Sequence, residues 1–455
     1  MTLLELNSGD TAWILTSAAL VLLMTPGLAF FYGGMVRAKG VLNMMMMSFI
    51  SMGVIGVLWV LFGYSMAFGN SVGGAGIIGN PFEFAGLESL LTNDPEASYP
   101  ALAFVAFQAC FAIITVALVS GAIADRASFG GWTLFAALWG TLVYFPAAHW
   151  VFALGDPESG LVGGWILNQI KAIDFAGGTA IHINAGTAAL ALALVVGPRI
   201  GFGSKPMRPH NMTLVMLGAA LLWFGWFGFN AGSAAAANGL ASLAWVNTLA
   251  ATAAAMLGWL LVEKLRDGHP TSLGAASGIV AGLVGITPAA GAVSPIGAII
   301  LGLVAGVACA YAVGLKFKFG FDDSLDVVGV HLVGGLVGTL LIGLLADPAT
   351  SGDPASPAVA GLFYGGGFDQ LWRQAVGAFS VMAFSFVMSY LIALLVKHTV
   401  GWRVSTSEEL GGIDLAEHSE AGYDLSPVYY SSRVGHTLVL TKDDFPETNK
   451  TGASK

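Results

Sequence analysis

The sequence predicts an all-α membrane protein that crosses the bilayer many times. Of its 455 residues, 56% are hydrophobic and only 10% are charged, and its mean hydropathy is +0.77. A soluble domain of this length needs more polar surface than this composition supplies. Uninterrupted apolar windows of about 20 residues recur along the chain, and each is long enough to cross the hydrocarbon core as a helix.

Eleven of these windows are predicted to be transmembrane helices. They cover residues 11–36, 41–68, 101–124, 131–151, 177–197, 211–236, 244–264, 272–289, 295–315, 326–346 and 370–397. The first window continues for about 25 residues, a length typical of a membrane span rather than a cleaved signal peptide.

Basic residues predict the orientation of these helices. Alternate loops contain Arg37, Lys39, Arg126, Arg199, Lys205, Arg208, Lys264, Arg266, Lys316 and Lys318. The opposite loops hold only Lys171 and Arg373. By the positive-inside rule the first set of loops is cytoplasmic, so the N-terminus is expected outside and the C-terminus inside.

Two stretches place a histidine within an apolar window. DFAGGTAIHINAG, residues 174–186, contains His182, and DVVGVHLVGG, residues 326–335, contains His331. Ionisable side chains inside a membrane are costly and by default mark a pathway. Each stretch opens with an acid, and each histidine is followed four residues later by a glycine, Gly186 or Gly335. On a helix that glycine lies one turn along the same face, where it lets a neighbouring helix approach closely.

The two histidine stretches open the fifth and tenth windows, which run in opposite directions. Five windows (11–197) plus five (211–346) plus a last helix (370–397) therefore suggest an inverted repeat. Such repeats place the transport site near the midplane, so His182 and His331 are expected one above the other along one path. A buried histidine can pass a proton or bond a small polar solute. Each could instead bond only a neighbouring helix, and Asp174 could cap its helix or contact a cation.

Three windows carry side chains at helical spacing that share a face. These are Trp226, Phe229 and Ser233; Phe107 and Phe111; and Leu28, Phe31 and Tyr32. Phenyl rings with a serine hydroxyl could hold a cation ahead of an apolar plug. Aromatic stripes of this kind are also common in ordinary helix packing.

Five long motifs, in order, closely resemble the ammonium transporter family (Amt/Mep, related to Rh proteins). They are PGLAFFYGGMVR, DFAGGTAIHINAG, GWFGFNAGS, TSLGAASGIVAGLVGITPAAG and DVVGVH, and the resemblance runs from about Ala12 to Tyr423. It implies eleven helices per subunit and a homotrimer with one pore in each protomer.

The resemblance also implies roles for individual residues. His182 and His331 match the twin histidines of the pore, Asp174 the acid at the recruitment site, Phe107 and Ser233 the outer site, and Phe111 and Phe229 the stacked gate. Trp226 matches the indole beside the pore, and Leu28, Phe31, Tyr32 and Val327 match inner-vestibule positions.

Two positions depart from the family pattern. The outer site usually has a tryptophan after a segment like PAAHWV, whereas this chain has Phe152 there and Trp150 two residues earlier. A phenyl ring keeps the cation–π face but lacks the indole donor. Asn70 stands where an acid is common.

Residues 398–455 are predicted to form a cytoplasmic regulatory tail. GGIDLAEHSEAGYDL, residues 411–425, resembles the family's tail and includes Gly411, Asp414, His418 and Tyr423. In that family the inner face can be plugged by a PII-type signalling protein. The chain after Leu425 is polar and predicted to be disordered.

The resemblance predicts a transporter of ammonium or ammonia in the cell membrane, with methylammonium as an analogue and lipid as its surroundings. No nucleophile, phosphate loop or metal cluster is present in the sequence, so no enzyme activity, cofactor or metal is expected. The basic residues form no patch for nucleic acid.

The same residues are compatible with three alternatives. A pore that passes only neutral ammonia would carry no current. Two histidines on separate helices could ligate haem, as in a b-type cytochrome. An ammonium sensor would bind but barely transport, although the tail is too short for a fused signalling domain.

Overall fold

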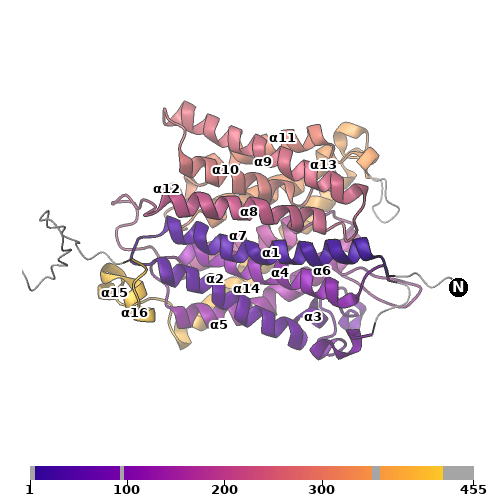
Figure 1. The fold of residues 1–455 in the computed structure, drawn as a ribbon, viewed down its shortest axis with the longest axis horizontal. Helices are drawn as coiled ribbons and strands as arrows, with labels where there is room; N and C mark the ends of the chain where they lie inside the picture. Colours follow the sequence, from indigo (N-terminus) through magenta and orange to yellow (C-terminus); the bar gives the residue numbers. More distant parts are fainter. Residues whose placement is uncertain (1–5, 93–96, 351–358, 424–455) are drawn as a thin grey trace, which may run out of the picture.

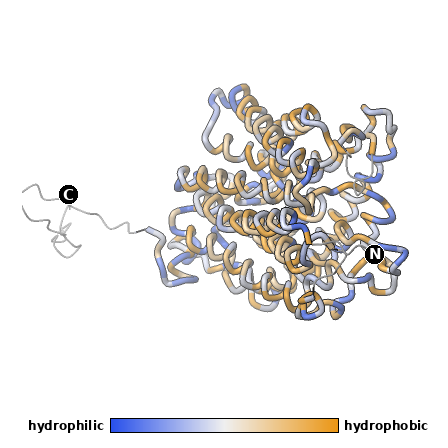
Figure 2. The backbone as a smooth tube through the Cα atoms, turned by 45° about the vertical axis from the view of Figure 1, so that its right-hand side comes forward, coloured by the Kyte–Doolittle hydropathy of each residue, from blue (hydrophilic) through white to orange (hydrophobic). Residues whose placement is uncertain are grey.

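The computed structural model describes residues 6–92, 97–350 and 359–423, and these residues form a bundle of helices (Figure 1). Figure 2 shows hydrophobic residues along the helices and hydrophilic residues concentrated in the loops at the two ends of the bundle. Ten helices in the described residues are long and apolar enough to cross a membrane. This agrees with the composition, because a helix satisfies its own backbone hydrogen bonds in lipid.

The first repeat, predicted at 11–197, contains five of these long elements. They are α1 (Ser8–Met35); α2 (Val41–Leu58), continued by η1 (Trp59–Gly63) and α3 (Tyr64–Phe68); α4 (Ala101–Val119) with η4 (Ser120–Ile123); α5 (Phe129–Trp139), continued by η5 (Gly140–Tyr144) and α6 (Phe145–Phe152); and η7 (Gly178–Ile183) leading into α7 (Asn184–Val196). Short turns η2 (Val72–Gly74), η3 (Ala85–Leu90) and η6 (Ile166–Ile170) lie in the connections.

The second half repeats this order. Its helices are α8 (Met212–Gly232), α9 (Gly239–Arg266), α10 (Ser272–Ile286), α11 (Pro295–Ala312) with α12 (Leu315–Phe319), and η8 (Val328–Leu332) leading into α13 (Val333–Leu345). The last long helix, α14 (Asp369–Thr399), follows the turns η9 (Pro348–Thr350) and η10 (Leu362–Tyr364) and precedes α15 (Thr406–Gly411) and α16 (Ile413–His418). The predicted eighth span corresponds to α10, an apolar helix of 15 residues that is shorter than the other ten.

Side-chain caps fix where several helices begin. Asn7 accepts from two amides at the start of α1, and Ser128, Asn211 and Thr271 each accept from an amide at the start of α5, α8 and α10. Ser294 caps α11, whose first residue is a proline that has no amide to satisfy. The start of α1 and the tail helices α15 and α16 lie at opposite ends of the bundle (Figure 1).

The two histidine-bearing elements, η7–α7 and η8–α13, pack directly against each other in the buried interior of the bundle. A Cβ on Gly186 would lie 2.3 Å from the Leu332 backbone nitrogen, and one on Gly335 would lie 3.0 Å from the Gly178 carbonyl oxygen. The prediction that these glycines allow close approach is therefore confirmed. Contacts this short are available only to a residue without a side chain.

Replacing Gly186 with alanine should lower the thermal midpoint of the detergent-purified protein, because the new methyl group collides with the backbone that carries His331. Overpacking of this kind costs about 1–3 kcal/mol. Gly53→Ala is the matched control, since a Cβ there would meet nothing within 4 Å. Equal midpoints for the two variants would contradict this account of the crossing.

Candidate pore and its twin histidines

His182 and His331 lie against each other at the centre of the structure. Both side chains are buried, their rings stack with centroids 5.3 Å apart, and their Nδ1 atoms are 3.2 Å apart. Two facing ring nitrogens can bond only if one donates and the other accepts. The pair therefore shares one proton at this contact, which leaves one outward Nε2 as a donor and the other as an acceptor.

Each histidine is positioned by a broken helix whose first amides are bound by a carboxylate. Asp174 accepts hydrogen bonds from the amides of Gly177, Gly178, Thr179 and Ala180 at 2.6–3.1 Å. A helix start leaves these amides without intrahelical partners, and a carboxylate there also interacts favourably with the helix dipole. The capping role considered for Asp174 is thus present in the structure.

Before His331 the corresponding acid is Asp323, which lies three residues ahead of Asp326, the acid that opens the DVVGVH stretch. Asp323 accepts from the amides of Val327 and Val328 at 3.1 and 2.7 Å. Asp326 instead has a left-handed φ of 64° and pairs with Lys316 at 2.6 Å. The acids Asp174 and Asp323 each precede their histidine by eight residues, a spacing that the sequence contained and that would have identified the true pair.

A column of rings connects the histidines to the predicted gate. Phe107 lies edge-on to Phe111 at 4.7 Å, and Phe111 stacks on Phe229 at 4.2 Å with 19° between the ring planes. Trp226 lies between Phe229, at 5.1 Å, and His182, at 5.4 Å. The rings come from α4 and α8, so stacking across these two helices closes the space above the histidines.

Below the gate a narrow cavity contains both histidines. The residues that line it are otherwise apolar or aromatic: Met24, Leu28, Phe31, Tyr32, Ile114, Leu118, Leu222, Trp226, Phe229 and Val280. Its volume of about 10 Å³ is about the space that one water-sized molecule requires. The buried Nε2 of His182 has no hydrogen-bond partner among the described residues, so it is available to a solute there. A haem does not fit this space.

Three of the inner-vestibule residues, Leu28, Phe31 and Tyr32, line this cavity. The Tyr32 hydroxyl donates to the Leu118 carbonyl at 3.0 Å. Val327 does not line the cavity but lies beside Tyr32, because both side chains border Gly121.

The outer-site residues are brought together only in part. The Ser233 hydroxyl donates to the Phe229 carbonyl at 2.9 Å, which places it beside the gate. Trp150 packs elsewhere: its indole donates to the Ile77 carbonyl at 2.7 Å, and its ring contacts Trp165 and Phe384.

Phe152 and Asn70, the two departures from the family pattern, have other contacts than the gate rings in the described part of the chain. Phe152 is half-buried at the end of α6, and no ring contact joins it to the Phe107–Phe111–Phe229 column in the described part of the chain. Asn70 has a structural contact, since its side chain accepts from the Val162 amide at 2.9 Å.

Sequence reasoning missed Thr287, whose hydroxyl accepts from the Trp226 indole at 2.8 Å and donates to the Leu283 carbonyl at 2.7 Å. A threonine in an apolar stretch carries no signal of such a contact. The apolar cavity residues Met24, Ile114, Leu222 and Val280 were also missed, since nothing in their type separates them from packing residues.

The tail packs against the start of α2. Asp414 accepts from the amides of Leu42 and Asn43 at 3.1 and 2.8 Å, and His418 lies 3.0 Å from the Asn43 side-chain oxygen. Tyr423 contacts His210 at 3.0 Å. Gly411 ends α15, and Gly412 after it has a left-handed φ of 130°. The prediction of disorder after Leu425 lies outside the described residues.

Comparison with known proteins gives one consistent result. A profile described as the Ammonium Transporter Family matches residues 12–423. The ammonium transporter of Mycobacterium tuberculosis is 61% identical over 440 residues, covering 92% of this chain and 91% of that protein. The Corynebacterium glutamicum ammonium transporter is 43% identical, covering 99% and 98%.

Solved structures agree with these sequence relatives. Mep2 of Candida albicans superposes with a TM-score of 0.82 at 33% identity, covering 98% of this chain and 93% of that one. Saccharomyces cerevisiae Mep2 gives 0.81 at 33%, covering 89% of each chain. A structure described as a sensor Amt protein gives 0.81 at 28%, covering 90% and 98%.

Replacing Trp226 with phenylalanine should reduce methylammonium uptake. The change removes the hydrogen bond from the indole to Thr287 and the larger indole face on which the His182 ring stacks. Trp150→Phe is the matched control and should leave transport within about twofold, because Trp150 packs away from the ring column. Initial uptake of labelled methylammonium into cells lacking their own transporters would compare the two. A larger loss of uptake in Trp150→Phe than in Trp226→Phe would contradict this account and would support a role for Trp150 in the outer site.

Asp323 should make stability depend on pH. Burial raises its pKa from 3.8 to about 6; the nearby charge of Asp326 adds to this rise, and Lys316 and the two amides that Asp323 binds oppose it. The folded chain therefore holds this proton more tightly than the unfolded chain, so the stability it contributes is complete below pH 3.8 and is lost as pH rises through 6. The loss is at most about 3 kcal/mol.

The measurement compares wild type with Asp323→Asn, which keeps an acceptor but cannot ionise. The thermal midpoint of the wild type minus that of the variant should fall between about pH 4 and 7. Carboxylates that do not interact with Asp323 cancel in this difference, so a flat profile would show that Asp323 does not titrate in this range.

Proposed function

This chain belongs to the ammonium transporter family of multi-pass membrane proteins, and we propose from this premise that it moves ammonium as separated ammonia and proton. The observation that carries the proposal is the narrow apolar cavity that encloses the twin histidines beneath the stacked gate rings. No charged residue in the described part of the chain lines that cavity, so its walls favour a small neutral solute over a cation. In bacteria such a protein lies in the plasma membrane.

Ammonium and potassium ions are similar in size, so a pore cannot separate them by radius. Moving either ion without water into a low-dielectric tube costs on the order of 20 kcal/mol in the Born limit. Ammonium alone can avoid this, because it can release a proton and cross as a neutral amine. Selectivity then follows from chemistry rather than from pore diameter.

We assign the steps to residues as follows. Ser233 and the ring of Phe107 hold the cation outside the gate by hydrogen bonding and by the ring quadrupole. The proton is released near Asp174 or the gate, and the amine passes Phe111 and Phe229. His182 and His331 then carry the proton through their shared hydrogen bond, which makes transport electrogenic.

The subunit arrangement and the regulation follow from family membership as further proposals. We propose a homotrimer with one pore in each protomer and a PII-type protein as a partner at the tail side. We also propose eleven transmembrane helices with the N-terminus outside. Residues 1–397 would form the transmembrane domain and residues 398–455 the cytoplasmic tail.

Current across proteoliposomes on a solid-supported membrane tests the mechanism. An ammonium pulse should give a current and a potassium pulse should give none. Silence in vesicles that still become alkaline with ammonia would contradict electrogenic transport and support a neutral gas pore. Silence in both assays would support a sensor.

His182→Ala should abolish at least 90% of the ammonium current, about a tenfold loss or about 1.4 kcal/mol, because the shared proton path is broken. His398→Ala, at the exposed end of α14, is the control and should retain full current. A His182→Ala variant that is folded and fully electrogenic would refute the role given to the pair.

A further inference from the structure

A cavity of about 380 Å³ opens at the end of the bundle where the tail packs, the end that the positive-inside rule places in the cytoplasm. It is separate from the narrow cavity that contains the histidines. Its wall includes Met35, one helical turn after Tyr32 on α1, together with Leu325. The cavity therefore lies immediately below the inner vestibule of the pore.

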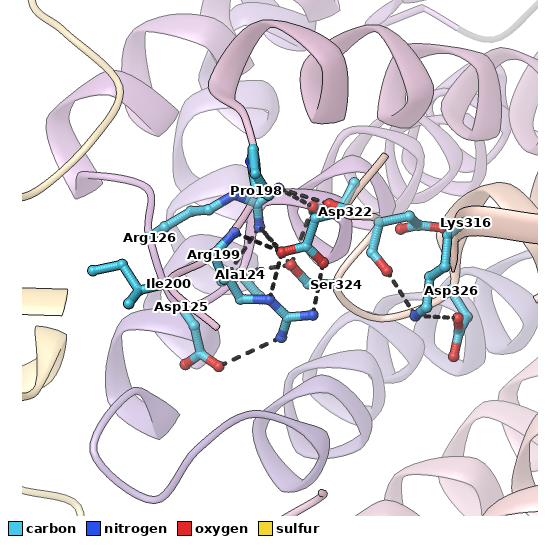
Figure 3. A network of polar contacts seen from close by, with 12 residues as sticks. Ala124, Asp125, Arg126, Pro198, Arg199, Ile200, Lys316, Asp322, Ser324 and Asp326 are labelled. Atoms are coloured by element: carbon cyan, nitrogen blue, oxygen red, sulfur yellow. Dashed lines mark hydrogen bonds and ion pairs between the residues drawn. The ribbon is translucent and has the colours of Figure 1, made fainter. Parts of the chain in front are cut away.

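Most of the cations at this end are neutralised by a fixed network, which Figure 3 shows. Arg199 binds both carboxylate oxygens of Asp322, at 2.8 and 2.9 Å. Arg126 donates to the backbone carbonyl of Asp322 at 2.7 Å and to the Ser324 hydroxyl. These residues are buried, and desolvation lowers the pKa of Arg126 to about 10, which still leaves it charged at neutral pH. The network is a rigid floor rather than a free binding surface.

Two further pairs complete this balance at the cavity wall. Lys316 pairs with Asp326 at 2.6 Å, and Arg37 pairs with Asp125 at 3.2 Å. Lys316 and Arg37 both line the cavity, and each is neutralised by its ion pair.

Lys205 and Arg208 remain, and both lie in the α7–α8 connection, are exposed and line the cavity. Among the described residues neither forms an ion pair with a carboxylate. Two positive charges at the mouth therefore lie on side chains that are free to bind an anion. Arginine and lysine are the usual partners of phosphate oxygens.

An aromatic wall stands beside these charges. Phe202, from the same connection, stacks on Phe317 of α12 with centroids 5.4 Å apart and 11° between the planes. Both rings line the cavity, and Phe317 is 62% exposed. An exposed ring next to free cations is suited to a flat ligand that carries negative charge, because a nucleobase stacked on an aromatic side chain contributes about 1–3 kcal/mol.

We propose that this cavity binds a nucleoside phosphate, with its phosphates on Lys205 and Arg208 and its base on the Phe202–Phe317 wall. A volume of about 380 Å³ lies within the range of sites for small organic ligands. The site goes beyond transport itself. Only its consequence rests on the proposed function: a nucleotide bound there obstructs the inner vestibule, so nucleotide on the tail side lowers ammonium current.

Binding of ATP to the purified full chain in detergent, without Mg²⁺, tests the site directly by calorimetry. Wild type should bind ATP with a Kd below about 1 mM. The double variant Lys205→Gln/Arg208→Gln should bind at least tenfold more weakly. Lys264→Gln/Lys318→Gln removes the same charge outside the cavity wall and should bind as wild type does. All four positions are exposed, so the substitutions should leave the fold intact. Thermal midpoints equal to that of the wild type would verify this.

Two more probes identify the ligand class. Phe317→Leu should weaken ATP binding about tenfold and leave inorganic pyrophosphate unchanged. If pyrophosphate and ATP bind equally and Phe317→Leu affects neither, the site takes a phosphate without a base and the nucleoside part is overturned. Preferential binding of dihexanoylphosphatidylglycerol would also overturn it in favour of a lipid headgroup. No binding of ATP at 5 mM, about fivefold above the expected limit, would overturn the site while leaving the ammonium current untouched.

Discussion

Two broken helices must satisfy their first backbone amides inside a membrane protein, and the rest of the pore depends on how they do so. An amide left without a partner in such surroundings costs several kcal/mol. Asp174 binds four of these amides and Asp323 binds two. Since each carboxylate lies eight residues before its histidine, the cap fixes the height at which that histidine stands. The contact between His182 and His331 is thus a consequence of two helix caps.

Much of this architecture could be predicted from the sequence, because length and hydropathy determine membrane helices directly. Ten of the predicted windows correspond to long apolar helices, and the eleventh to the shorter α10. The histidines were found because an ionisable residue in an apolar run is conspicuous. Asp326 opens the apolar run that contains His331, but the capping acid is Asp323, because a left-handed turn at Asp326 that composition does not reveal brings Asp323 to the first amides.

Ring packing was harder to predict for the same kind of reason. Helical spacing put Phe107 and Phe111 on one face, but it could not say that Phe229 would stack on Phe111 across two helices. The resemblance to ammonium transporters supplied that pairing. Trp150 was placed at the outer site because it lies two residues before Phe152. Its indole instead donates to the Ile77 carbonyl, which belongs to a loop distant in sequence. Contacts such as that of Trp226 with Thr287 depend on tertiary geometry alone.

The two histidine-bearing elements are alike in their capping turns but not in charge, and in the proposed mechanism this difference gives the pathway its polarity. Gly177 and Asp326 occupy the same position, three residues after their capping acids, and both have left-handed φ values. Glycine adopts that conformation without strain. Aspartate does so at some cost, and here it gains an ion pair with Lys316. One end of the path is therefore built from a glycine turn and aromatic rings, which attract cations. The other is built from a charged network beside the unpaired cations Lys205 and Arg208, which in the proposed mechanism repel cations and favour release of a neutral amine.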